Sequence, residues 1–201
     1  MIRIFGKTKN KPVTIVSGLP RSGTSMVMKM LEAGGIPPLT DNIRTADTDN
    51  PKGYYEFERV KKLRDGDVSW LPEAQGKAVK VIAALITHLP SKYEYRVLFM
   101  RRNIHEILAS QSKMLENRGE ESKADDDTMK DLFQKHLIKV RGWMNNQPNL
   151  IYLDIDYNEI LKDPVPYISQ INHFLGGNLD EEKMLTVVDS SLYRQRKQPA
   201  T

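Results

Sequence analysis

The stretch VTIVSGLPRSGTSMVM, residues 13–28, constrains the fold of this 201-residue chain more than any other part of the sequence. It joins a β-branched apolar run to a helix-forming run through a loop in which Gly18 and Gly23 permit a tight turn. A phosphate-binding loop needs this order of strand, glycine loop and helix, because backbone amides at the helix N-terminus then face the anion. The pattern therefore predicts an anion site at the end of a strand.

The loop differs from the nucleotide-binding pattern Gly-x-x-x-x-Gly-Lys-Ser/Thr at one position. Thr24 stands where that pattern has the lysine that reaches the β- and γ-phosphates of a nucleoside triphosphate. The cation of this loop is Arg21, whose planar, permanently charged group suits phosphate or sulfate oxygens. Thr24 and Ser25 add hydroxyl donors. The loop therefore favours an anion other than the β,γ end of a triphosphate.

Strand-like and helix-like runs alternate along the rest of the chain. Nearly continuous apolar runs predict buried strands at 13–17, 78–83, 96–100 and 150–155. Helical patterns lie at 23–35, 55–63, 103–115, 127–144 and 163–177. The alternation predicts an α/β fold with three layers and a mainly parallel central sheet, related to the P-loop NTPases. We expect a single domain over residues 1–201.

Composition excludes several kinds of site and partner. The absence of cysteine rules out disulfides, cysteine–zinc sites and a cysteine nucleophile. The histidines lack ligand-like spacing, so no metal site is predicted: His88, His105, His136 and His173. A net charge of +4 suits an anionic ligand, but no basic patch with interleaved aromatics predicts nucleic-acid binding. No apolar run predicts a membrane span or a signal peptide, so we expect a cytoplasmic protein.

A second pattern, LFMRRNIHEILASQ at residues 98–111, places Arg102 at the end of the third predicted strand and Ser110 eight residues later. On a helix that starts near Asn103, Ser110 would lie roughly 10 Å along the axis and face the same way as the start. A long arginine and a small hydroxyl could converge there on one phosphate. The neighbouring Arg101 is the competing candidate.

Together, GLPRSGTS and the Arg102–Ser110 pair resemble the donor-binding motifs of sulfotransferases. The resemblance implies a loop that wraps the 5′-phosphosulfate of 3′-phosphoadenosine 5′-phosphosulfate (PAPS), formed by Arg21, Ser22, Gly23, Thr24 and Ser25. It also implies that Arg102 and Ser110 hold the 3′-phosphate of the donor. Sulfotransferases need no metal for this reaction, and none is expected here.

Two further stretches resemble the same family. DNPKGYYEFERV at 49–60 is similar to a motif of bacterial-type members, and YLDIDYNEILKDP at 152–164 is similar to the segment in which a tyrosine contacts the donor adenosine. That residue would be Tyr157, whose alternative role is a packing aromatic. The chain departs from the family at Met26, where cytosolic members have a tryptophan. Its basic tail SLYRQRKQ at 191–198 lacks the family's glycines, which leaves open whether it grips the 3′-phosphate or frays.

Sulfuryl transfer needs a cation at the leaving group and a base at the acceptor. Arg21 is the predicted leaving-group stabiliser, and the resemblance implies that Lys80 aims at the transferred group. Glu56 is the first candidate for the base, and we expect it in the first turn of the helix at 55–63, where its alternative role is a favourable helix charge. The other candidate bases are His88, Asp41 and Asp49.

The leading hypothesis is therefore a PAPS-dependent sulfotransferase that acts on an acceptor hydroxyl or amine of a small molecule, glycan or peptide. One alternative is a nucleotide or small-molecule kinase with a degenerate loop, for which Asp154 and Asp156 could serve a metal. The other is a non-catalytic binding module for PAPS or a nucleotide. The sequence identifies neither the acceptor nor the oligomeric state.

Overall fold

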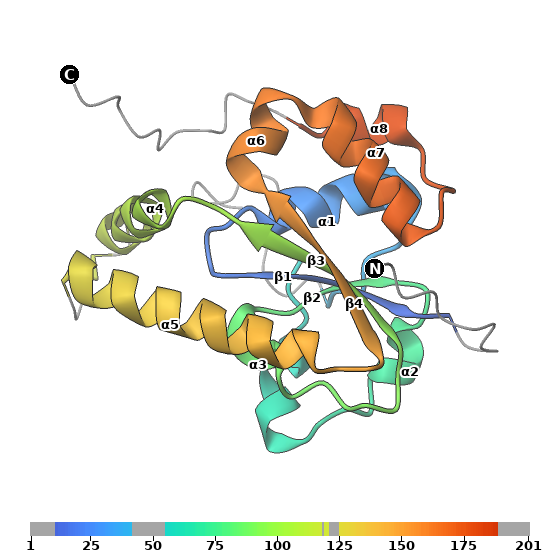
Figure 1. The fold of residues 1–201 in the computed structure, drawn as a ribbon, viewed down its shortest axis with the longest axis horizontal. Coiled ribbons are helices and arrows are strands. Elements are labelled where there is room, and N and C mark those ends of the chain that lie inside the picture. The colour runs from blue at the N-terminus through green and yellow to red at the C-terminus, as the bar shows by residue number, and fades with distance from the viewer. Residues whose placement is uncertain (1–10, 42–54, 118, 121–124, 189–201) are drawn as a thin grey trace.

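The computed structural model describes residues 11–41, 55–117, 119–120 and 125–188. Four parallel strands form one sheet in the order β2-β1-β3-β4 (Figure 1). They are β1 (Val13–Gly18), β2 (Ala78–Lys80), β3 (Tyr95–Arg101) and β4 (Leu150–Asp156). The predicted α/β class and parallel sheet are confirmed.

Helices cover both faces of this sheet, which makes three layers (Figure 1). One face carries α1 (Thr24–Ala33), α6 (Tyr157–Lys162), α7 (Pro164–Leu175) and α8 (Glu181–Leu185). The other carries the 3-10 helix η1 (Glu58–Asp65), α2 (Leu71–Ala74), α3 (Ala83–Ile86) and α5 (Asp126–Asn145). The helix α4 (Ile104–Asn117) follows β3 and contacts α5. No helix within these described ranges is long and apolar enough to cross a bilayer.

The core is divided by the sheet, because alternate residues of each strand point to opposite faces. In β1, Ile15 packs with Trp70 and Val140 on the α5 face, whereas Val16 packs with Met28 and other residues on the α1 face. All six residues of β1 are buried. This explains why the strands read as continuous apolar runs rather than as alternating ones.

Register brings the functional segments together at the carboxyl edge of the sheet. Gly18 pairs with Met100, and Arg101 pairs with Asp156, so the ends of β1, β3 and β4 coincide. Lys80, the last residue of β2, pairs with Val16. The segments that follow these strands, including the glycine loop and the starts of α4 and α6, therefore emerge at one edge, where ligands bind in parallel α/β sheets.

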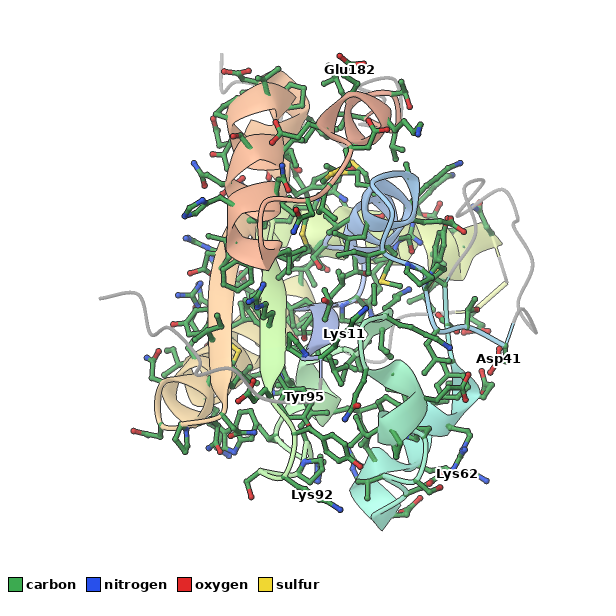
Figure 2. The ribbon with its side chains drawn as sticks, turned by 90° about the vertical axis from the view of Figure 1, so that its right-hand side faces the viewer. Lys11, Asp41, Lys62, Lys92, Tyr95 and Glu182 are labelled. Carbon is green, nitrogen blue, oxygen red and sulfur yellow. The ribbon has the colours of Figure 1, made fainter. Side chains whose placement is uncertain are left out.

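Two predicted elements differ from the structure. The second strand was expected at 78–83 but ends at Lys80, because the chain turns there into α3. The expectation of Glu56 in the first turn of a helix is wrong: the helix begins at Glu58, and Phe57 has an extended backbone. The Asp41 carboxylate accepts the backbone N–H of Glu58 over 2.6 Å and so fixes the helix start there. Figure 2 shows Asp41 at the margin of the fold, well apart from Tyr95 at the start of β3.

Candidate active site

The glycine loop is held in a conformation that few residues adopt. Gly23 has a left-handed backbone with φ 97°, and its carbonyl accepts the N–H groups that start α1. Arg21 is also left-handed, with φ 67°, although it carries a side chain. Such a residue is strained by about 1 kcal/mol and persists only where its surroundings hold it. The residues around Arg21 therefore help to stabilise the conformation of the loop.

The hydroxyl of Ser22 is buried in the loop. Ser22 is 1% exposed, and its Oγ has no hydrogen-bond partner within the part of the chain that the structure describes. A buried polar atom left unpaired costs about 1–3 kcal/mol, so such atoms in native sites call for an explanation. An anion oxygen in the loop would supply the missing partner.

Arg21 connects the loop to both residues of the second motif. Its Nε donates to Ser110 Oγ over 3.0 Å, and its carbonyl oxygen accepts from an Nη of Arg102 over 3.0 Å. Arg102 follows directly after β3, and Ser110 lies buried in α4. The two residues that the sequence assigned to one phosphate thus converge on the loop, with Arg21 between them.

Tyr157 covers the loop from the start of α6. A Cβ on Gly23 would come within 2.2 Å of the ring carbon Cδ2, so only a glycine fits beneath the ring. The same ring also contacts Arg102, whose Cζ lies 4.6 Å from the ring centroid. Burial raises the pKa of the Tyr157 hydroxyl. Tyr157 therefore joins the loop residues and Arg102 in one cluster.

Glu56 and Lys80 meet on the β2 side of the loop. Lys80 Nζ lies 3.8 Å from Glu56 Oε1 and 3.4 Å from Ser25 Oγ. The side chains are 12% exposed for Lys80 and 26% for Glu56, so water reaches the carboxylate more than the ammonium. Lys80 therefore lies between the candidate base Glu56 and Ser25 of the candidate anion loop.

The segment before Glu56 is also held under strain. Tyr55 is left-handed, with φ 52°, and its hydroxyl donates to Glu32 Oε2 on α1 over 2.5 Å. Burial and this hydrogen bond raise the pKa of Tyr55. The Glu56 carbonyl accepts from the Thr40 hydroxyl over 2.9 Å. Contacts on both sides therefore fix the backbone that carries Glu56.

The structure places the other candidate bases differently. Asp41 is engaged at the start of η1, as described above. His88 is exposed and lies between α3 and β3, on the path to the amino edge of the sheet. Asp49 lies outside the described residues, as do the basic positions 194, 196 and 197 of the tail. Glu56 is thus the candidate base that the described residues bring beside the loop.

The aspartates that a kinase reading would use are engaged in structural roles. Asp154 pairs with Arg141 of α5 on the far face of the sheet, and Asp156 caps α6 by accepting the N–H groups of Asn158 and Glu159. Among the described residues, no three acidic or histidine side chains gather as a metal site.

Sequence reasoning missed two residues of the cluster. Glu106 is 4% exposed and pairs with Arg102, and Asn158 donates its amide to the Glu106 carboxylate. Arg102 and Glu106 are four residues apart, so the acid in the first turn of α4 can reach back to the arginine that precedes the helix. The four-residue spacing is visible in the sequence, whereas the contact of Glu106 with Asn158, 52 residues away, is not.

A glycine loop at the carboxyl edge of a parallel sheet, opening a helix, defines an α/β protein of the P-loop NTPase-like class. Within this class, residues 11–200 match the model of the sulfotransferase domain, and the chain belongs to this family. Membership makes sulfuryl transfer from PAPS the activity of its class, and it does not favour the kinase or binding-module alternatives.

Solved structures agree on the fold. The sulfotransferase domain of the Synechococcus PCC 7002 olefin synthase superposes with a TM-score of 0.59 at 16% identity, over 99% of this chain and 94% of that one. Sulfotransferase STF1 of Mycobacterium tuberculosis H37Rv gives 0.56 at 16% identity, over 89% and 71%. Mouse sulfotransferase SULT7A1, solved in complex with 3′-phosphoadenosine 5′-phosphate (PAP), gives a TM-score of 0.53 at 18% identity, over 94% of this chain and 66% of that one. No curated protein sequence matches the chain.

Proposed function

We propose that this protein binds PAPS at the glycine loop and transfers its sulfuryl group directly to an acceptor hydroxyl or amine, releasing 3′-phosphoadenosine 5′-phosphate (PAP). The observation that carries the proposal is the convergence of Arg21, Ser110 and Arg102 around the loop. Two arginines and a hydroxyl on adjacent elements are suited to a ligand with an anion at each end. PAPS, with a 3′-phosphate and a 5′-phosphosulfate, is such a ligand.

The residues of the loop fit the donor's anions. The backbone at the start of α1, the buried Ser22 hydroxyl and the side chains of Thr24 and Ser25 would hold the 5′-phosphosulfate. Arg102 and Ser110 would hold the 3′-phosphate, and Tyr157 would contact the adenosine. The absence of the triphosphate-binding lysine at Thr24 agrees with a donor that has no γ-phosphate.

Three side chains would share the chemistry. Glu56 takes the proton from the acceptor as its oxygen or nitrogen attacks sulfur, while the bond from sulfur to the bridging oxygen breaks. Arg21 neutralises the charge that develops on the bridging oxygen of the leaving PAP. Lys80 lies between Ser25 of the loop and Glu56, where it would offset charge on the transferred group.

Calorimetry with PAP, ATP and GTP, each with and without Mg²⁺, tests the proposal. We expect PAP to bind more tightly than either triphosphate and to bind equally well without metal. Binding of ATP that depends on Mg²⁺ would overturn the donor assignment in favour of a kinase. Binding of PAP without turnover of PAPS across a broad panel of acceptors would favour a non-catalytic module.

Several finer expectations belong to the same proposal. The acceptor is a small molecule, glycan or peptide, and the chain forms one domain over residues 1–201. We expect it to act in the cytoplasm, without nucleic-acid or membrane partners.

A further inference from the structure

The most unusual charged residue near the loop is Glu106. Its side chain is 5% exposed, and it lies beside the arginine assigned to the donor's 3′-phosphate. Removing a carboxylate from water costs several kcal/mol unless an opposite charge and hydrogen bonds compensate. A carboxylate close to a phosphate site also repels the phosphate. Its position therefore calls for an explanation.

The partners of Glu106 leave it little freedom. Oε2 accepts from Arg102 Nε over 3.2 Å, and Asn158 Nδ2 lies 3.1 Å from Oε1 and 2.9 Å from Oε2. Asn158 is itself oriented, because its Oδ1 accepts the backbone N–H of Asn103 over 3.3 Å. The amide of Asn158 therefore points its donor side at the carboxylate.

These contacts fix the plane of the Arg102 guanidinium from several sides. Glu106 holds Nε, the Arg21 carbonyl accepts from an Nη, and the Tyr157 ring lies against the Cζ. An arginine fixed in this way loses little side-chain entropy when it binds an anion, and its fork of donors is already aimed. The arrangement spans the starts of α4 and α6 and the donor loop.

We propose that Glu106 and Asn158 are positioning residues that hold Arg102 in the orientation in which it recognises the donor's 3′-phosphate. This inference rests on the proposed function. Neither residue is assigned a contact with the donor. Their effect passes through Arg102, so it applies to ligands that carry a 3′-phosphate and spares those that lack one.

The sign of the effect separates positioning from simple charge. If Glu106 acted on the site only through its charge, then its removal would strengthen the binding of a phosphate. If Glu106 positions Arg102, then E106Q weakens the binding of PAP although a negative charge has gone. At metal sites, partners that orient a ligand side chain are typically worth about tenfold or more in affinity, and we expect an effect of that size here.

The experiment is calorimetry of the full chain with PAP and with adenosine 5′-monophosphate, which lacks the 3′-phosphate. We expect E106Q to bind PAP about tenfold more weakly than wild type and adenosine 5′-monophosphate equally well. N158A keeps the Arg102–Glu106 ion pair but removes the amide that donates to Glu106. We expect its affinity for PAP to fall by about threefold and its affinity for adenosine 5′-monophosphate to stay unchanged. N158A decides the question if E106Q fails to fold.

D154N is the matched control, because it breaks the Arg141–Asp154 pair on the opposite face of the sheet. It should change neither affinity. Equal losses for both ligands in E106Q and N158A would reduce Glu106 to a structural role and overturn the inference, as would tighter binding of PAP. A wild-type protein that does not prefer PAP would instead refute the assignment of the 3′-phosphate to Arg102, and the inference with it.

Discussion

Tyr157 lies against Gly23 so closely that a methyl group on the glycine would come within 2.2 Å of the ring carbon Cδ2. The contact joins the donor loop to the start of α6, which are far apart in the sequence. The contact also fixes the distance between the Tyr157 ring and the loop backbone at Gly23. A substitution at Gly23 therefore tests whether this packing matters for donor binding.

We expect G23A to unfold more easily than wild type by about 2–4 kcal/mol, since it adds a clash to the strain of a left-handed backbone. We also expect it to lose PAP binding. The control is G35A, because Gly35 is left-handed as well, with φ 104°, but nothing lies within 4 Å of its would-be Cβ. G35A should cost only about 1 kcal/mol and keep the affinity for PAP. Denaturant unfolding and calorimetry measure both, and equal losses in the two variants would argue against the clash.

R21A should lower turnover much more than donor affinity. Arg21 is assigned to the charge that develops on the leaving oxygen, and the loss of one such group typically costs about 100-fold in rate. We expect the affinity for PAP to fall by a smaller factor than the rate, because Arg102 and the loop amides stay in place. R101A is the control, since Arg101 is exposed at the end of β3. A rate loss in R101A as large as that in R21A would show that the assignment is wrong.

E56Q should abolish most of the turnover while leaving PAP affinity unchanged. The amide keeps the shape of the side chain but cannot accept the acceptor's proton, a step worth about 10²–10⁴-fold in rate. Steady-state rates with an identified acceptor measure the effect. E58Q provides the comparison, because Glu58 pairs with Lys61 at an exposed position two residues away. Full turnover in E56Q would remove Glu56 as the base.

Y55F should reduce turnover several-fold without weakening PAP binding. The variant removes the hydrogen bond to Glu32 that anchors the strained residue preceding Glu56, and it keeps the packing of the ring. A misplaced catalytic group commonly loses rate rather than donor affinity. Y152F removes a comparable hydroxyl bond, that from Tyr152 to Asn145, on the α5 side. If Y152F lost as much turnover as Y55F, then the effect would not come from the position of Glu56.

Acid should destabilise the protein in part through Asp67. The guanidinium of Arg59 and the Ser69 hydroxyl hold the pKa of this carboxyl at about 2. An unfolded aspartate titrates near pH 3.9, so the folded value is depressed. The contribution to stability is therefore complete above about pH 4 and disappears as the pH falls towards about 2. Denaturant unfolding from pH 6 to pH 2 should show a shallower loss in D67N than in wild type. The control is D65N, which removes the exposed carboxyl of the last residue of η1, two residues before Asp67.

Much of the fold could be predicted from the sequence, because local patterns encode it. Apolar runs marked β1, β3 and β4 to within about two residues, and the glycine spacing marked the turn between β1 and α1. Local pattern failed where a distant residue decides. The helix expected around Glu56 begins later, where Asp41 accepts the N–H of Glu58, and β2 is short because α3 begins at Ala83, three residues after Lys80.

The residues of the proposed donor loop form one continuous sequence pattern, whereas the residues that contact them from other elements do not. Arg21, Ser22 and Gly23 lie in one short pattern whose chemistry is visible in the sequence. Glu106 and Asn158 matter through a contact that only the meeting of α4 and α6 creates. Likewise, the hydrogen bond from the left-handed Tyr55 to Glu32 of α1 has no local signature.

The chain of contacts from the loop through Arg102 and Glu106 to Asn158 limits how the proposed donor site could be transplanted. A graft of only the loop between β1 and α1 onto another parallel sheet would transfer Arg21 without Arg102. It would also lack Glu106 and Asn158, the residues that orient Arg102 in our proposal. The smallest portable unit also includes the starts of α4 and α6, together with the register that aligns the ends of β1, β3 and β4. The site is thus a property of three strand ends rather than of one loop.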